Sequence, residues 1–294
     1  MSVTLADWQM EVGGVWVGEG TVVDLTSLDT GSHETRSQDV PAVLDDARYF
    51  GRDRLTPGTW SLVMSINESS EQAAREVLQT LHTAWGGRKV RETTGAVQTL
   101  RYRLTGGTTR RIYGRPRRFT PVLTNLFLGH VPVAYDFALA DTAIYEDGEY
   151  SISLGVGAAN LSGQGMSFPI SFPLLWGEPG AAQQRTAHVG GLEPTWLTTR
   201  IQGPITDPYV HVGPKMLALR GEIPAGEAVT LRGASWEQGA FWNDGTPAGD
   251  MLDPRTRLAN LRVEPGSHAV TFGGIDATGT ATATVSWRNA YSMI

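Results

Sequence analysis

The segment that decides the fold lies near the end of the chain: LANLRVEPGSHAVTF (258–272), GGIDATGT (273–280) and ATATVSWRNAY (281–291). Pro265-Gly266 predicts a turn, because proline presets φ and glycine accepts a positive φ. Apolar and hydroxyl side chains then alternate with a period of two from Thr280 to Trp287, which is typical of a strand with one buried and one solvated face. We therefore predict two antiparallel strands here, within an all-β sandwich that the final strand closes.

Short apolar runs before this segment extend the same pattern through the last third of the chain. They lie at His211, 217–219, 229–231, 258–263 and 270–272, and proline and glycine turns separate them. Short strands at this spacing indicate a sandwich or a jelly roll. We assign residues 188–294 to this second domain.

The first half of the chain combines strands with one helix. One face of a predicted strand over 59–66 carries Trp60, Leu62, Met64 and Ile66. Apolar residues then recur at spacings of three and four from Ala74 to Trp85, which predicts a helix with one apolar face against a sheet. Ser69 and Gln72 fit a capping box at its start, and Gly86-Gly87 fits its end.

Further alternating strands are predicted over 97–104, 110–113, 131–139 and 150–154. We expect residues 1–157 to form an α+β domain, a sheet or barrel with one helix, which makes the whole fold mainly β. Residues 158–187 are rich in Gly, Ser, Pro and Gln and are expected to link the two domains. Residues 25–53 are polar and irregular, and a loop of that length is typical of a functional or interface segment.

The amino-acid composition excludes several functional classes of protein. The chain has 294 residues, 40% apolar and 18% charged, as expected for a soluble globular protein. Its net charge of −6 gives no reason to expect specific nucleic-acid binding. It has no cysteine, which excludes disulfides, thiolate metal sites and a cysteine nucleophile. We expect no secretory signal and no membrane span, because no basic leader and no run of 18 apolar residues occurs.

Local catalytic and cofactor motifs are not found. GVGAAN (155–160) follows a strand, but the sequence after it cannot be the helix that a phosphate site needs. The six histidines form no zinc-binding pattern, and no G-x-S-x-G occurs. Adjacent carboxylates at Asp45-Asp46 and Glu146-Asp147 point to opposite faces of an extended chain, so neither is a ready acid–base pair. We expect no enzyme, cofactor or metal site, and a hydrolase with dispersed carboxylates stays a remote alternative.

A run of arginines marks the middle of the first domain. It comprises Arg101, Arg103, Arg110, Arg111, Arg115, Arg117 and Arg118. Such a run could contact phosphates. The acidic net charge favours instead a solvated strand face or an ion-paired interface, and we favour a contact between subunits.

Three aromatic residues lie in a polar, glycine-rich stretch of the second domain. They are Trp236, Phe241 and Trp242, within ASWEQGAFWNDGTPAG (234–249). Aromatic side chains on such a hairpin can stack on sugar rings or make outward contacts. The more ordinary interpretation, which we favour, is that they cap the sandwich core or are buried at a contact.

The order of these patterns resembles the distal tail proteins of siphoviruses, the long-tailed phages with non-contractile tails. These distal tail proteins are also called minor tail proteins. In the first domain the resemblance rests on FGRDRLTPGTWSLVMSI (50–66), LRYRLTGGTTRRIYGRPRRF (100–119) and VAYDFALADTAIYED (133–147). In the second it rests on HVGGLEPTWLTTRIQGPITDPYVHV (188–212), GEIPAGEAVTLR (221–232) and LRVEPGSHAVTF (261–272). The Trp-rich loop departs from simpler members.

The resemblance implies a virion structural protein of the tail-tip baseplate, made in the host cytoplasm. A homo-hexameric ring of tail-tube-like N-terminal domains would stand at the tip of the tail tube. The C-terminal sandwich would be galectin-like and point outward, and that name describes a fold without implying sugar binding. Its partners would be the tail tube protein, the hub or tail-associated protein, and fibre or receptor-binding proteins. The alternative from a different class is a carbohydrate-binding module of a host-recognition protein.

Overall fold

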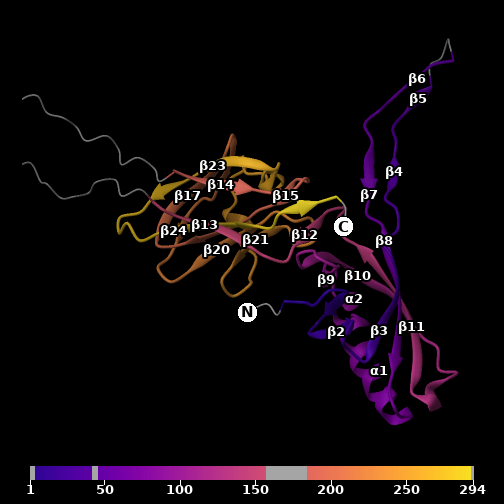
Figure 1. The fold of residues 1–294 in the computed structure, drawn as a ribbon. Coiled ribbons are helices and arrows are strands. Elements are labelled where there is room, and N and C mark those ends of the chain that lie inside the picture. Colours follow the sequence, from indigo (N-terminus) through magenta and orange to yellow (C-terminus); the bar gives the residue numbers. More distant parts are fainter. Residues whose placement is uncertain (1–3, 42–45, 157–183, 293–294) are drawn as a thin grey trace, which may run out of the picture. The chain divides into compact units, whose positions relative to one another are not determined.

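The computed structural model describes residues 4–41, 46–156 and 184–292, which form two compact units. Unit 1 comprises Met1–Gly148 with Tyr291–Ile294, and unit 2 comprises Glu149–Ala290. The chain leaves unit 1 after Gly148 and re-enters it at Tyr291. Each unit has its own apolar core. The architecture is mainly β, as the sequence predicts (Figure 1).

A large sheet forms the body of unit 1, with seven strands pairing antiparallel in the order β2-β1-β9-β10-β11-β8-β3. Two short strands, β12 and β25, extend it beside β10. The bounds of these nine strands are β1 Gln9–Val12, β2 Val15–Gly18, β3 Val23–Asp29, β8 Thr59–Asn67, β9 Gln98–Arg103, β10 Arg110–Pro121, β11 His130–Leu139, β12 Ile144–Glu146 and β25 Ala290–Tyr291.

Alternation along the central strands builds the core of unit 1. On β8 the side chains of Trp60, Leu62, Met64 and Ile66 are all buried, as predicted. Trp60 lies edge-on to Tyr102 of β9, with ring centroids 5.0 Å apart. The sheet therefore has one continuous apolar face, which the helix covers.

Helix α1 (Glu71–Trp85) buries Ala74, Leu81 and Trp85 in this core. Its N-cap is Ser70, whose hydroxyl oxygen accepts a hydrogen bond from the backbone N–H of Ala73. The predicted cap at Ser69 is thus wrong by one residue, and Gln72 donates to Glu76 instead of completing a capping box. A second, five-residue helix, α2 (Arg88–Glu92), follows Gly87 and was not predicted.

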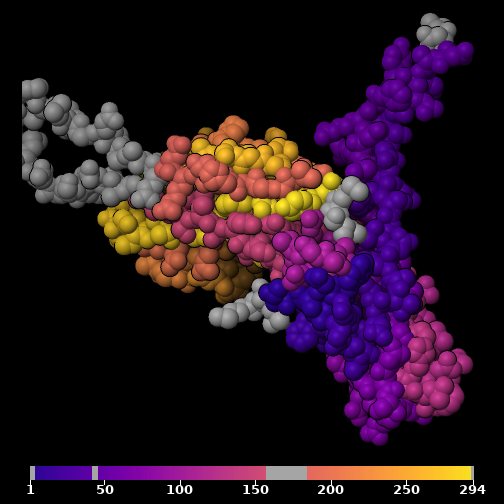
Figure 2. All heavy atoms as spheres, in the orientation of Figure 1, coloured from indigo at the N-terminus to yellow at the C-terminus, as the bar shows by residue number. Residues whose placement is uncertain are grey.

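Residues 25–53, predicted to be irregular, contain the end of β3 and three short strands, so that prediction is wrong in part. β3 continues to Asp29 and pairs with β8. Beyond it the chain forms a two-stranded ribbon in which β4 (Glu34–Arg36) pairs with β7 (Arg54–Thr56), and β5 (Val40–Pro41) pairs with β6 (Arg48–Tyr49). This projection, residues 30–58, is called the arm here, and Figures 1 and 2 show it standing clear of the sheet of unit 1.

Unit 2 is a sandwich of two antiparallel sheets, ordered β13-β24-β16-β20-β21 and β14-β23-β17-β18, with β19 paired to β17. Residues of both sheets share one core, including Ile201, Leu231, Val210 and Phe272. The bounds are β13 Tyr150–Gly155, β14 Gln184–Val189, β15 Thr195–Trp196, β16 Thr198–Gln202, β17 Ile205–Val212, β18 Lys215–Ala218, β19 Glu222–Ile223, β20 Ala228–Arg232, β21 Gly239–Trp242, β22 Arg262–Val263, β23 Gly266–Ile275 and β24 Thr282–Trp287.

The fold-deciding segment forms both strands expected of it, but they do not pair with each other. β23 lies in one sheet and β24 in the other. The turn at Asp276 carries the chain between the sheets, and its carboxylate accepts hydrogen bonds from the backbone N–H groups of Thr278 and Ala281. Most of the strand expected over 258–263 is a 3-10 turn, Leu258–Leu261, followed by the short β22.

Strand β13, which the sequence analysis placed in the first domain, pairs with β24 in unit 2. Most of the linker expected at 158–187 lies outside the described residues. The domain ranges predicted from sequence otherwise stay a prediction.

Candidate functional site

The arginines of the middle region lie on neighbouring strands of unit 1, but most of them have partners inside it. Arg101 on β9 and Arg111 on β10 both bind the carboxylate of Asp147. The Arg101 guanidinium donates at 2.7 Å to Asp147 Oδ2 and at 3.2 Å to Glu11 Oε2. The side chains of Arg101, Arg111 and Asp147 are only 13%, 16% and 8% exposed. These residues form a partly buried ion cluster.

The cluster controls the ionisation of Asp147. Burial opposes the charged form, but hydrogen bonds from Arg101 and Arg111 outweigh it and hold the pKa of Asp147 below its usual value. The same contacts raise the pKa of Arg101. The cluster is therefore fully charged near neutral pH and acts as a structural brace between β9, β10 and the segment after β12.

Three more arginines have contacts within unit 1. Arg103 lies 3.0 Å from Asp7 and donates to the carbonyl oxygen of Leu5. Arg110 lies over the ring of Tyr291, 4.3 Å from its centroid. Arg115 donates to the backbone carbonyl oxygens of Thr93 and Ala96, which fixes the segment after α2.

Arg117 and Arg118 are the exposed members of the run. They lie where β10 bulges against β11, because the register shifts between Pro116 and Arg118. The Arg118 side chain is 55% exposed and 4.0 Å from Asp136, a separation at which a surface pair contributes little. An interface role for the seven arginines stays a prediction, and these two have the exposure that it requires.

The three aromatic residues of unit 2 do not form one stacking face. Phe241 and Trp242 are adjacent on the edge strand β21, so they point to opposite sides. Trp242 packs against the core, whereas Phe241 faces outward with the Arg232 guanidinium 5.4 Å from its ring centroid. Trp236 lies before the strand and is half-buried. This arrangement fits the capping interpretation better than a sugar platform.

The arm exposes apolar side chains that nothing in the described chain covers. Val40, Tyr49, Phe50 and Leu55 are 59%, 68%, 84% and 53% exposed, and are called the arm patch here. A two-stranded ribbon alone is marginally stable in water. The arm therefore has the properties of a segment that docks on a partner.

A second apolar surface lies at the turn between β10 and β11. Val122, Leu123, Phe127 and Leu128 are between 49% and 66% exposed, and are called the loop patch here. The turn is held rigidly, because Gly129 adopts a positive φ and its carbonyl oxygen accepts a hydrogen bond from the backbone N–H of Glu68. A Cβ at Gly129 would lie 2.0 Å from the Glu68 carbonyl oxygen. Only glycine fits so close an approach.

The sequence analysis missed the loop patch, although a signal was present. PVLTNLFLG (121–129) is an apolar run at a hairpin turn, where polar residues are usual. An apolar turn between two strands indicates a surface that contacts another molecule.

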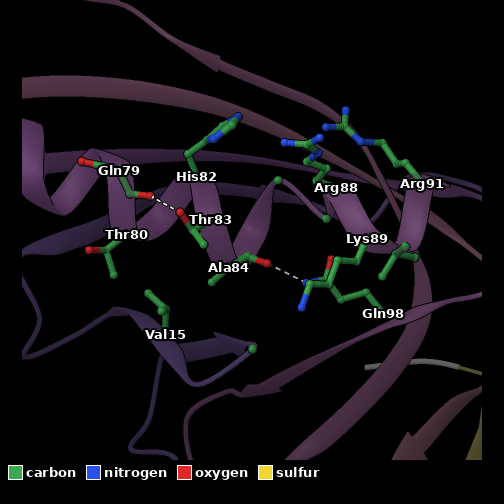
Figure 3. A pocket seen from close by; sticks show the side chains of 14 residues that line it. Val15, Gln79, Thr80, His82, Thr83, Ala84, Arg88, Lys89, Arg91 and Gln98 are labelled. Carbon is green, nitrogen blue, oxygen red and sulfur yellow. Dashed lines mark hydrogen bonds between the residues drawn. The ribbon is translucent and has the colours of Figure 1, made fainter. Parts of the chain in front are cut away.

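A basic hollow of about 980 Å³ lies between α1, α2 and β2. Its rim carries Arg88, Lys89, Arg91 and His82 (Figure 3). Gln98 closes one side by donating to the carbonyl oxygen of Ala84 at 2.6 Å. Arg88 is already paired with Glu92 at 2.9 Å, so the hollow is a polar surface feature with part of its charge compensated.

In unit 2 the buried Asp253 binds two exposed arginines. Arg220 Nε donates to Asp253 Oδ2 at 2.8 Å, and Arg255 Nε donates to Oδ1 at 3.1 Å. Hydrogen bonds from Arg255 and then Arg220 hold the pKa of Asp253 well below its usual value. The group fixes the segment after the 3-10 turn Gly249–Met251 against β18.

Over the described residues, no group of three or more His, Cys, Asp or Glu side chains is arranged to hold a metal ion. Within the same ranges, none of the helices combines the length and apolar character needed to cross a membrane.

The arrangement of both units can be compared with known proteins. No protein-family model and no curated protein sequence matches the chain. Solved structures do match over nearly its whole length. The chain has the fold of the Dit protein of phage SPP1. The two structures superpose with a TM-score of 0.58 at 10% identity, over 96% of this chain and 98% of the SPP1 Dit chain.

Two structures of the phage P2 baseplate in its activated conformation match as well, one with calcium and one with strontium. Their TM-scores are 0.52 and 0.54, with 10% and 12% identity and 91% of each chain covered. The SPP1 protein is described as a paradigm of the hub adsorption apparatus in phages that infect Gram-positive bacteria. The likeness confirms, at the level of fold, the resemblance that the sequence patterns suggest. The Dit fold accounts for both units, the sheet with its helix and the sandwich.

Proposed function

We propose that this chain is a structural protein of a phage tail tip and works by assembly instead of catalysis. The observation that carries the proposal is the match to SPP1 Dit, which spans 96% of this chain and 98% of the other. Two features support it independently of the match. The arm and the turn between β10 and β11 both present apolar side chains to solvent, as subunits of an assembly do.

In the finer form of the proposal, six copies form a ring at the distal end of the tail tube. Unit 1 forms the ring, and unit 2 is directed outward as a galectin-like sandwich. The ring joins the tail tube protein on one side to the hub or tail-associated protein on the other, with fibre or receptor-binding proteins around it. Heterologous contacts, in which different surfaces of each copy meet, close such a ring.

Negative-stain electron microscopy of the purified chain, alone and mixed with the tail tube protein of its phage, tests the proposal. We expect class averages with six-fold symmetry and a central hole in at least the mixed sample. Light scattering after size exclusion gives the number of copies independently. A chain that stays monomeric in both samples, at high concentration, contradicts the ring.

A matched pair of variants links the ring to the arm. Replacing residues 32–57 by a short Gly-Ser turn removes the arm but leaves the pairing of β3 with β8. We expect this variant to remain folded by circular dichroism and to lose the ring. The control substitutes the exposed Leu192 of unit 2 with alanine and is expected to keep the ring.

A further inference from the structure

A hollow of about 400 Å³ lies beside β17 and β18 of unit 2 and is called the β17–β18 pocket here. Met216 and Leu219 give it apolar walls. Its polar lining includes Asp207, Tyr209, Arg220 and Arg255. Ligand-binding cavities usually measure about 300 to 1,000 Å³ and combine apolar walls with a few fixed polar groups. The β17–β18 pocket has this size and this composition.

The two arginines of the pocket are held in place by one buried carboxylate. Arg220 Nε and Arg255 Nε each bind one oxygen of Asp253, whose side chain is only 5% exposed. The terminal nitrogens of both guanidinium groups make no hydrogen bond to the described part of the chain. A side chain that is already fixed loses less conformational entropy when it binds a ligand. The two guanidinium groups are therefore preorganised donors at the edge of the pocket.

Asp207 adds a hydrogen-bond acceptor, and its backbone is strained. Its φ is 49°, and it lies where the register of β17 against β23 shifts. The Asp207 N–H donates to the carbonyl oxygen of Gly221, and Asp207 Oδ1 accepts from the Gly221 N–H at 2.8 Å. Oδ2 accepts no hydrogen bond from the described residues. Bulges re-aim side chains, and strained backbone recurs at binding sites, so this carboxylate has the properties of a ligand contact.

The Tyr209 ring lies across the neighbouring strand β23. A Cβ at Gly273 would lie 2.4 Å from both the ring Cζ and the hydroxyl oxygen of Tyr209, so only glycine leaves room for the ring. His211 contacts Tyr209 edge-on, with ring centroids 5.5 Å apart. The Tyr209 hydroxyl makes no hydrogen bond to the residues that the structure describes. An aromatic ring held in this way can stack on the face of a sugar ring.

The charges that line the pocket cancel, which limits the ligands that it suits. Two guanidinium groups and two carboxylates line it, so its formal charge is zero near neutral pH. An oxyanion would meet both carboxylates and a cation would meet both guanidinium groups, and desolvating either ligand is costly. A hydroxyl group donates one hydrogen bond and also accepts. Neighbouring hydroxyls on an uncharged ligand can therefore satisfy guanidinium and carboxylate groups together.

We propose that the β17–β18 pocket binds a neutral sugar, with Tyr209 stacked on one face of the sugar ring. The two arginines and Asp207 hydrogen-bond its hydroxyl groups. The site uses none of the three aromatic residues, Trp236, Phe241 and Trp242, that the sequence offers for sugar stacking. It gives unit 2 a binding role besides assembly and does not depend on the ring.

Saturation-transfer NMR titration of the purified full-length protein tests the site. The neutral probes are glucose, galactose, mannose and N-acetylglucosamine. The charged probes are glucuronate and galacturonate, which carry a carboxylate on the same rings, and inorganic phosphate. We expect at least one neutral sugar to bind with a dissociation constant on the order of 1 mM, more tightly than any charged probe.

Two results of this titration overturn the proposal. One is the lack of a saturable signal from any of the four neutral sugars at about 50 mM. The other is a charged probe that binds more tightly than every neutral sugar, which would make the pocket an anion site.

Matched variants locate the binding. Tyr209→Ala is expected to weaken the neutral sugar by about tenfold, whereas His188→Ala, in β14 of the same sheet, should leave the affinity unchanged. Thermal unfolding shows whether each variant is folded. Equal affinities in the two variants contradict the stacked ring.

A second pair of variants changes only exposed side chains. Arg255→Gln is expected to weaken the neutral sugar by about tenfold, and Asp253 keeps Arg220 as its partner. The control is Arg257→Gln, an exposed arginine that does not line the pocket. Equal affinities for this pair overturn the site even if Tyr209→Ala does not fold.

Asp207→Asn gives a readout that a structural role would not produce. Asparagine tolerates a positive φ, and its Oδ1 can still accept from the Gly221 N–H. The substitution removes a negative charge and replaces an acceptor by a donor. We expect the preference to reverse, so that glucuronate binds more tightly than glucose. An unchanged order of affinities shows that Asp207 does not face the ligand and overturns the proposed geometry.

Discussion

Asp147 is the shared ion-pair partner of two partly buried arginines. Its carboxylate binds Arg101 and Arg111, which come from adjacent strands, and Glu11 is a second counter-ion for Arg101 alone. Removing one partner of a buried pair costs more than the pair itself contributes, because the remaining charge stays desolvated. The stability of unit 1 therefore depends on this single carboxylate.

Asp147→Asn is expected to lower the free energy of unfolding of unit 1 by about 3 kcal/mol, since it leaves two guanidinium groups poorly compensated. Urea unfolding followed by tryptophan fluorescence measures the change. Asp136→Asn is the control, because its partner Arg118 is 55% exposed and the loss should stay below about 0.5 kcal/mol. Equal losses in the two variants would contradict the brace.

The pH dependence of stability gives a second check on Asp147. Its pKa is lowered in the folded protein, so its contribution is complete above the unfolded value of about 4 and is lost as the pH falls through the folded value. The difference in unfolding free energy between wild type and Asp147→Asn should thus shrink below about pH 4. A difference that stays constant down to about pH 2 would show that protonation of Asp147 is not involved.

Sequence reasoning found the arginines but not their partners. Alternation on β9 correctly puts Arg101 and Arg103 on the face opposite Leu100 and Tyr102. Their counter-ions include Glu11 of β1 and Asp7 just before it, which lie more than about eighty-five positions away in the chain. No local pattern carries that information, so the internal partners of these arginines could not be predicted, and their interface role stays a prediction.

At the scale of elements, strands with one face buried against a core could be predicted from the sequence, and strands exposed on both faces were missed. β8, β11 and β24 alternate clearly because one face meets a core. The strands of the arm are short and largely exposed, as in β4 and β5. When neither face of a strand is buried, apolar and polar residues need not alternate along it. The sequence of the arm therefore showed no strand pattern.

The start of α1 gives a prediction at this scale. Ser70→Ala removes the hydroxyl that accepts from Ala73 N–H and is expected to cost about 1 kcal/mol of unit 1 stability. Ser69→Ala should change it by less than about 0.5 kcal/mol, because that exposed side chain has no described hydrogen bond. Thermal or urea unfolding of the two variants, measured side by side, decides between the caps. A larger loss for Ser69→Ala would restore the capping box expected from sequence.

At the scale of the whole molecule, the sequence predicted a helix-covered sheet and a sandwich but not how the chain joins them. The final residues return to unit 1, where Tyr291 donates its hydroxyl to Glu146 and packs under Arg110. Burial, and then the neighbouring Glu146 charge, raise the pKa of Tyr291, which keeps that donor proton in place. A short segment of this kind has no periodicity that could have revealed its partner.

Tyr291→Ala should therefore destabilise unit 1 rather than unit 2, by about 1 to 2 kcal/mol. Tyr291→Phe keeps the ring beneath Arg110 and should lose only about half as much. Hydrogen exchange followed by mass spectrometry locates the change, with faster exchange expected in β10 and β12. Faster exchange confined to the sandwich strands would contradict the assignment.

The return of the chain at Tyr291 also has a consequence for biosynthesis. Domains usually fold in the order in which they leave the ribosome. Unit 1, however, is interrupted, and Tyr291 is translated only after all of unit 2. The sheet beside β12 thus remains unfinished throughout synthesis of the sandwich, and each nascent chain completes unit 1 only after unit 2 has been made.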